Sequence, residues 1–238
     1  MMRTLLLSGS NNHDWRRTTP YCQALLESTG YFAVDVSLDP GRELQDAFDP
    51  AGYDLIFTDY NGPDWPEAAR HHFIDAIRAG AGLLVLHAAN NAFPDWPEYG
   101  QAIGLRFLPP ASGHGEFHRF RVEPLSDHPI AAGLDPFFTF DELYHGMLPM
   151  EETHYEIVAS AYSDPARGGS GKREPAAIAL RLGAGRVFHM LLGHVWPEPV
   201  DPHYRGHEMT ALENEGFGQL LLRGCLWAAG GDPARLSV

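Results

Sequence analysis

Hydrophobic residues in the first 90 positions alternate between two spacings. Short, mostly apolar runs are typical of β-strands, and they occur at 3–8, 31–37, 53–59 and 82–87. Amphipathic segments at 18–28, expected to be capped by Thr18 or Thr19, and at 66–79 predict helices between them. The run at 83–86 holds no polar residue, which is typical of a strand buried on both faces. This order predicts an α/β fold with a doubly wound, mostly parallel sheet and helices on both faces.

The hydrophobic pattern changes after Pro94. A short helix is expected at 98–103, and a long amphipathic helix at 213–229 closes the chain. Extended segments lie between them, at 116–122, 137–144, 154–161, 176–182 and 186–192. The turns that join them indicate an additional antiparallel portion. Since no linker or internal repeat divides the 238 residues, we expect one domain over 1–238.

The net charge limits the classes of partner, and the cysteines bear on the cellular compartment. With 17 Lys and Arg against 31 Asp and Glu, the net charge of −14 repels phosphate backbones and acidic membranes, so we expect no nucleic acid or membrane partner. No apolar segment approaches the roughly 20 residues that span a bilayer. Cys22 and Cys225 lie in apolar helical settings and are expected to be buried free thiols, which fits a reducing cytoplasm. Unless a bound cation reverses the local charge, a small neutral substrate is favoured over a highly anionic one. The sequence leaves a homo-oligomer open.

Two predicted strands end in histidine. His87 follows the run at 83–86, and His194 follows the strand at 186–192 after Gly193. Ligands of open α/β sheets bind beyond the carboxyl ends of the parallel strands, so both imidazoles are expected at one functional edge. The alternative for each is a structural histidine that bonds a backbone carbonyl. His189, inside its strand, fits that structural role better.

Further polar residues cluster near the predicted strand ends. Asn90 follows His87, while Asn12 and His13 lie in the loop after the first strand. His114 lies between two glycines, which leaves it mobile and exposed.

The segment 140–145 places Asp141, Glu142 and Tyr144 in an otherwise apolar strand. Buried acids are costly unless they are paired, so at least one is expected to reach a partner or ligand. Alternation puts Asp141 on one face and Glu142 with Tyr144 on the other. The alternative is the solvated face of an edge strand.

Several catalytic motifs are missing from the sequence. No Gly-x-Gly-x-x-Gly follows the first strand, and neither Gly-x-Ser-x-Gly nor His-Glu-x-x-His occurs. Neither cysteine follows a strand. His203 and His207 have the spacing of helical metal ligands, but Pro202 and Gly206 favour a surface loop there.

Taken together, the chain resembles the ThuA-like (trehalose utilisation) family, which has the class I glutamine amidotransferase-like fold. The resemblance runs nearly end to end and rests on five motifs, at 80–89, 127–134, 141–144, 183–188 and 192–194, together with the closing Leu226-Trp227-Ala228. It implies a flavodoxin-like sheet, an extra antiparallel portion, and a role in disaccharide or keto-sugar catabolism. True amidotransferases carry a cysteine near the position of His87, so thiol-dependent glutamine hydrolysis is not expected.

These observations lead to a carbohydrate-processing enzyme in which His87 and His194 converge with Glu142 or Asp141 as catalytic residues. His87, His194 and Glu142 would hold a divalent metal such as zinc, or the imidazoles would exchange protons with a keto-sugar without metal. The small-molecule sugar is expected to contact polar and aromatic residues, namely Asn12, His13, Asn90, His114 and Tyr144, with Trp15 and Trp96 as flat faces. One alternative is a non-catalytic sugar-binding or regulatory protein. Another is a hydrolase of a different small polar substrate.

Overall fold

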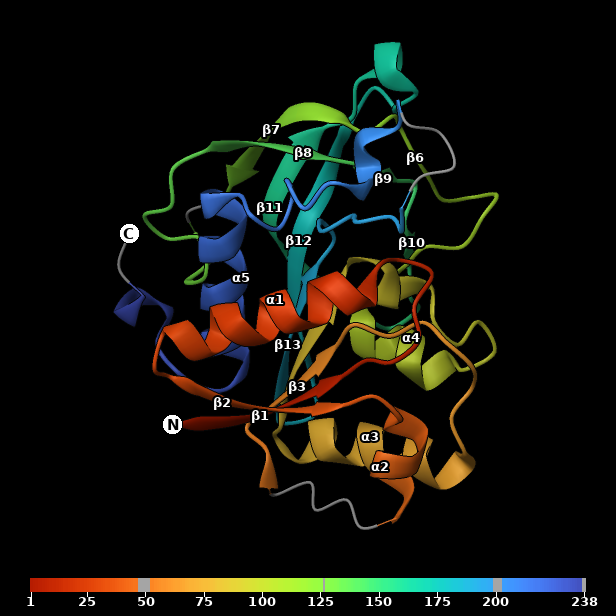
Figure 1. Cartoon of the computed structure of the whole chain (residues 1–238), viewed down its shortest axis with the longest axis vertical. Coiled ribbons are helices and arrows are strands. Elements are labelled where there is room, and N and C mark those ends of the chain that lie inside the picture. The colour runs from red at the N-terminus through yellow and green to blue at the C-terminus, as the bar shows by residue number, and fades with distance from the viewer. Residues whose placement is uncertain (47–51, 126, 199–202, 237–238) are drawn as a thin grey trace.

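One nine-stranded sheet runs through the molecule (Figure 1). The computed structural model describes residues 1–46, 52–125, 127–198 and 203–236. Within these residues the strand order is β2-β1-β3-β4-β13-β12-β11-β7-β8. The expected α/β fold, with a mostly parallel part extended by an antiparallel part, is confirmed.

The parallel part of the sheet comprises five strands, β1 (Met2–Leu7), β2 (Phe32–Ser37), β3 (Leu55–Thr58), β4 (Gly82–Leu86) and β13 (Gly185–Met190). The antiparallel part continues from β13 through β12 (Arg173–Leu182), β11 (Tyr155–Tyr162), β7 (His118–Pro124) and β8 (Phe137–Asp141). Two short antiparallel pairs lie outside it, β5 (Leu105–Arg106) with β10 (Leu148–Pro149) and β6 (Gly113–His114) with β9 (Tyr144–His145). The carboxyl ends of β1, β4 and β13 therefore share one edge.

Helices cover both faces of the parallel strands (Figure 1). One hydrophobic core holds Leu84 and Leu86 with residues of α1 (Trp15–Ser28) and α5 (Glu215–Ala228). The other holds Leu83 and Val85 with residues of α2 (Pro40–Asp46), α3 (Glu67–Ala79) and α4 (Pro97–Ile103). Alternate residues of β4 thus face opposite cores, which explains why the run at 83–86 lacks a polar residue.

Two local predictions differ from the structure. Helix α1 begins at Trp15, and Thr18 and Thr19 do not cap it. Their hydroxyls instead donate to Asp59 Oδ2, at 2.6 and 2.9 Å, so they serve a buried network. The strand expected at 137–144 is interrupted, because β8 ends at Asp141 and β9 starts at Tyr144. The predicted alternation of faces therefore stops at Asp141.

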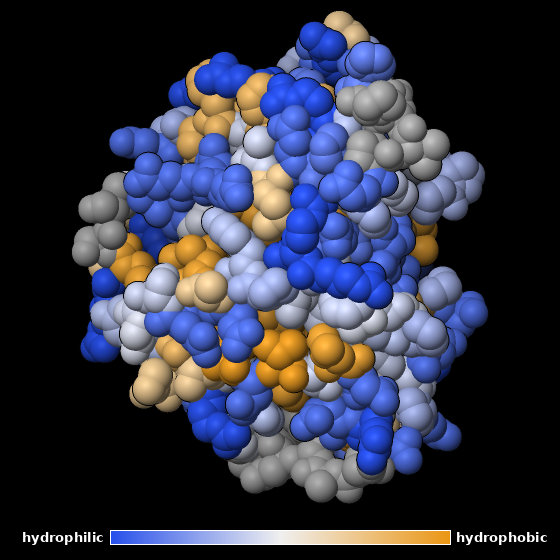
Figure 2. Space-filling view, viewed as in Figure 1, coloured by the Kyte–Doolittle hydropathy of each residue, from blue (hydrophilic) through white to orange (hydrophobic). Residues whose placement is uncertain are grey.

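Hydrophilic residues cover most of the face seen in Figure 2, with smaller hydrophobic patches between them. None of the described helices combines the length and the apolar character needed to cross a membrane. Cys22 and Cys225 are buried free thiols, as expected, and burial raises the pKa of both.

Candidate functional site

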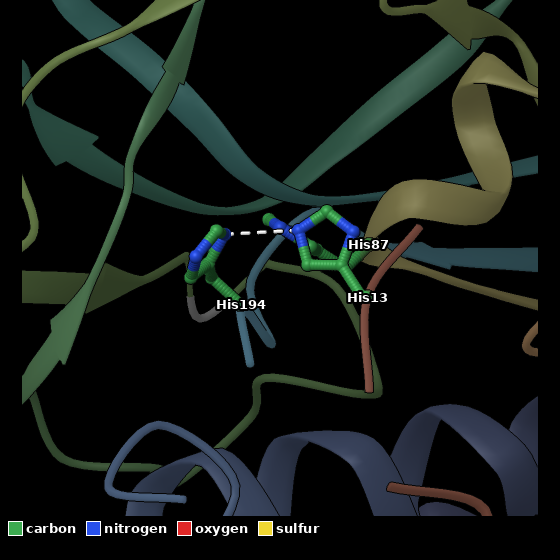
Figure 3. Close-up of side chains that lie close together, drawn as sticks. All are labelled: His13, His87 and His194. Carbon is green, nitrogen blue, oxygen red and sulfur yellow. Dashed lines mark hydrogen bonds between the residues drawn. The ribbon is translucent and has the colours of Figure 1, made fainter. Parts of the chain in front are cut away.

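Three imidazoles meet beyond the carboxyl ends of the parallel strands (Figure 3). His13 lies in the loop between β1 and α1, His87 comes directly after β4, and His194 follows β13. One ring nitrogen of each lies within 4.8 Å of those of the other two. The rings of His87 and His194 are 5.5 Å apart between centroids, and all three residues are at most 7% exposed. The predicted convergence of His87 and His194 is thus present, and His13 joins them.

In each imidazole one ring nitrogen, the inner one, faces the other two rings, and the outer one is hydrogen-bonded to a neighbouring residue. His87 Nδ1 donates to the Leu191 carbonyl at 2.7 Å, and His13 Nδ1 donates to Asn12 Oδ1 at 3.0 Å. His194 Nε2 lies 2.9 Å from the hydroxyl of Tyr204. That hydroxyl donates its own proton to Glu142, so its oxygen accepts from His194. These bonds leave the inner nitrogen of every ring unprotonated, as in metal-binding histidines.

The three imidazoles are neutral at physiological pH. Burial lowers the pKa of His13, His87 and His194, the last to about 2, and the neighbouring imidazoles lower them further. The inner nitrogens of His13 (Nε2) and His194 (Nδ1) are 2.9 Å apart, within hydrogen-bond distance (Figure 3), but in the tautomers described above neither carries a proton to donate. Neutral imidazoles are the protonation state that binds metal, and a cation between facing lone pairs would relieve their repulsion. The donor set therefore fits a divalent metal ion.

Backbone geometry at two turns fixes this convergence. His87 has φ +39°, in the left-handed region that favours glycine, immediately after β4. Such strained positions are over-represented at functional sites. Gly193 has φ +125°, which a side chain would strain, and it turns the chain so that His194 faces His87.

The side chain of Asp141 stabilises the turn at Gly193 through hydrogen bonds to its backbone. Its carboxylate accepts from the backbone amides of Gly193 at 2.7 Å and His194 at 3.2 Å, and also from that of Glu142. Burial raises the pKa of Asp141 to about 8, although these amide donors act in the opposite direction. The contacts described for Asp141 thus position His194, whereas its neighbour Glu142 reaches the cluster.

Glu142 is the carboxylate beside the imidazoles. It is 4% exposed, and its Oε2 lies 3.2 Å from His194 Nδ1 and 3.1 Å from His114 Nδ1. Burial raises the pKa of Glu142, while the Tyr204 hydrogen bond opposes the shift. The side chain of His114 is 41% exposed, so it connects this buried carboxylate with solvent.

Tyr144 completes the inner site. Its hydroxyl lies 2.9 Å from His87 Nε2, and its ring stacks on that imidazole with centroids 4.4 Å apart. Because His87 Nδ1 already donates to Leu191, Nε2 accepts from the Tyr144 hydroxyl. Burial raises the pKa of Tyr144, so the hydroxyl remains a donor at neutral pH.

Other predicted contacts lie elsewhere. Asn90 turns away from the imidazoles, with its amide nitrogen 3.3 Å from His189 Nε2, and both residues are fully buried. Asn12 reaches the site through His13. Trp96 is buried in an aromatic cluster with Trp65 and Phe73, and Trp15 lines a separate surface cavity of about 260 Å³. His207 lies in a short 3-10 turn, without the helix that paired metal ligands require.

Sequence patterns gave no indication of Tyr204 and Trp196. Both lie in the irregular chain between β13 and α5, where hydrophobic periodicity carries no information. Trp196 lies 5.2 Å from His13 and 5.9 Å from His194, measured between ring centroids. For Trp196, the position two residues after His194 is the one sequence feature that links it to the site.

Comparisons with known proteins agree with this architecture. The family model for ThuA, trehalose utilisation, matches residues 3–205. The crystal structure of a putative ThuA-like protein from Parabacteroides merdae ATCC 43184 is 31% identical, with a TM-score of 0.85, covering 97% of this chain and 91% of that one. Another, from Bacteroides uniformis ATCC 8492, is 16% identical with a TM-score of 0.68, covering 98% and 94%. A cytoplasmic protein from Salmonella typhimurium LT2 is 14% identical with a TM-score of 0.57, covering 93% and 97%. No curated protein matched.

Proposed function

Because the chain belongs to the ThuA, trehalose utilisation, family, we propose that it is a carbohydrate-breakdown enzyme with a divalent metal ion at His13, His87 and His194. Family membership supports the carbohydrate role. One observation supports the metal: three neutral imidazoles present their inner nitrogens to one another while their outer nitrogens are hydrogen-bonded.

The donor set favours zinc. Catalytic zinc sites typically have three protein ligands, often histidines, and a fourth position for water or substrate, whereas magnesium and calcium prefer oxygen ligands. His13 thereby takes the ligand role that the sequence suggested for Glu142. Glu142 lies close enough to act on a group bound beside the imidazoles.

A bound zinc ion would polarise a sugar carbonyl or lower the pKa of a water molecule. Glu142 would then take up a proton at Oε2 and return it, because burial raises its pKa toward the neutral range in which proton transfer is efficient. His114 would carry protons between Glu142 and solvent. The Tyr144 hydroxyl would orient a substrate oxygen near His87.

The proposed substrate is a small neutral disaccharide or keto-sugar, and the proposed location is the cytoplasm. The two buried free thiols are consistent with a reducing compartment. The net charge of −14 supports a small-molecule partner over a nucleic acid or an acidic membrane.

Metal analysis combined with a substrate screen tests this proposal. We expect about one zinc per chain after loading and dialysis, with turnover of keto-disaccharides in preference to simple esters and amides. His13→Ala, His87→Ala and His194→Ala should lose zinc and turnover, whereas His71→Ala, at an exposed position on α3, should retain both. A protein without stoichiometric metal, whose sugar affinity is unchanged in the three variants, would instead be a non-catalytic sugar-binding protein.

A further inference from the structure

An exposed aromatic ring lies against the buried imidazoles. Trp196 is 39% exposed, whereas His13 and His194 are 7% and 2% exposed. The indole ring is nearly parallel to that of His194, with an interplanar angle of 2°, and it meets the His13 ring edge-on. Phe117, half-buried, lies 6.1 Å from His194 between ring centroids. Aromatic side chains therefore line this side of the imidazole cluster, and the indole ring of Trp196 reaches solvent beside it.

Hydrogen bonds fix the position of Trp196 relative to the site. Its amide donates to the Gly206 carbonyl at 2.7 Å, and its own carbonyl accepts from Arg17 at 3.1 Å. One residue earlier, the Val195 carbonyl accepts from the Asp14 amide at 2.8 Å, which ties this segment to the loop that carries His13. These bonds hold the backbone of Trp196, and the contacts of its ring with His13 and His194 limit side-chain rotation, which reduces the entropy cost of binding a ligand.

Two arginines near the backbone of Trp196 are already paired. Arg17 bonds Asp14 at 2.6 Å, and Arg205 makes two bonds with Glu208. Inside the site, Glu142 contributes negative charge. Apart from the proposed metal ion, a phosphate or carboxylate on the substrate would therefore meet an acid, and it would have to break an existing ion pair to gain either arginine.

We propose that Trp196 is the platform for the apolar face of an uncharged pyranose ring, whose oxygen atoms then point toward His194 and Glu142. This inference rests on the proposed function and assigns a binding residue to the neutral sugar proposed there. A pyranose presents C–H groups on one face and hydroxyls around its edge. It therefore fits a flat apolar surface beside a polar centre, the usual composition of a small-molecule site.

Equilibrium binding to the zinc-loaded protein tests the platform. The probes are α,α-trehalose and methyl β-D-glucopyranoside as neutral sugars, and glucose 6-phosphate as the charged one, with Kd measured by calorimetry. We expect both neutral sugars to bind, and Trp196→Ala to weaken them at least tenfold. Trp196→Phe, which keeps a flat ring, should stay within about threefold of the wild-type Kd, in line with the energy of one aromatic contact.

Trp15→Ala is the matched control, because Trp15 lines a surface cavity that includes none of the three histidines. The Kd of this variant for both neutral sugars should equal that of wild type. Zinc content, measured in every variant, separates this inference from the metal proposal. Wild-type affinity in Trp196→Ala would overturn the platform. So would tighter binding of glucose 6-phosphate than of trehalose in both the zinc-free and the zinc-loaded protein, since a phosphate that binds the metal alone would show this only with zinc present. Zinc-loaded wild-type protein that binds neither neutral sugar would overturn it too. Failure to bind zinc would instead refute the proposed function.

Discussion

Replacing Tyr204 with phenylalanine removes one hydroxyl and changes two interactions at the site. That hydroxyl accepts from His194 Nε2 at 2.9 Å and donates to Glu142 Oε1. Without it, His194 loses the partner that keeps its proton on the outer nitrogen. The inner nitrogen, Nδ1, can then carry the proton, and a protonated nitrogen does not bind metal.

The magnitude follows from the type of contact. Loss of a hydrogen bond that orients a metal-binding histidine lowers metal affinity about 10- to 100-fold, or ~1.4–2.8 kcal/mol. Tyr204 is half-buried, so water can replace part of the lost contact, and a value near the lower end is expected. The fold itself should change little, because the tyrosine ring is retained.

Competition with a chromophoric zinc chelator at fixed pH measures the effect. Tyr204→Phe should release zinc at a chelator concentration about tenfold lower than wild type does. Tyr162→Phe is the control, since Tyr162 lies on β11 and is 52% exposed. Thermal melts of the zinc-free proteins should coincide. Equal zinc affinity in Tyr204→Phe and wild type would refute the role given to this hydroxyl.

Three further predictions concern the residues that shape the site. Asp141→Asn replaces a carboxylate that accepts from backbone N–H donors with an amide NH₂, so urea denaturation above pH 8, where Asp141 is ionised, should show a loss of ~1–3 kcal/mol; an unchanged midpoint would contradict this. Gly193→Ala puts a Cβ 3.1 Å from Leu86 at φ +125° and should cost ~1–3 kcal/mol with weaker zinc binding; a fully stable variant would show that the turn tolerates a side chain. Burial lowers the pKa of His189 from 6.5 to about 4, so as the pH falls His189 is protonated in the unfolded chain before it is protonated in the folded one. The contribution of neutral His189 to the free energy of unfolding is complete above pH 6.5 and declines toward pH 4, by ~2 kcal/mol between pH 7 and 5. His189→Gln should lack this decline, and equal declines in the variant and wild type would exclude His189 as its source.

The parallel half of the fold was predictable because strands buried on both faces leave a strong hydrophobic signal. The run at 83–86 and its alternation between two cores are the clearest case. Helix α2 was not predicted, since within Pro40–Asp46 Leu44 is the one described residue that belongs to a hydrophobic core. The helix start was expected at Thr18 or Thr19, but the hydroxyls of both threonines instead donate to Asp59 within the folded chain.

At the site, strand ends carried most of the predictive information. His87, His194 and Glu142 each follow a strand, and topology brings strand ends to one edge. Asn90 was assigned to this edge as well. The 3-10 turn at His87–Asn91 instead buries it beside His189. Trp196 and Tyr204 were missed because their contacts depend on how a long irregular segment folds back on the strands.

The ligand set of the zinc-loaded protein is the most direct test of the central claim. X-ray absorption at the zinc edge distinguishes imidazole nitrogens from carboxylate oxygens. We predict three histidine nitrogens at ~2.0–2.1 Å, and a spectrum that loses one of them in His13→Ala but keeps all three in Glu142→Gln. A zinc ion held by fewer than three imidazoles, or a protein that does not retain zinc, would contradict the account.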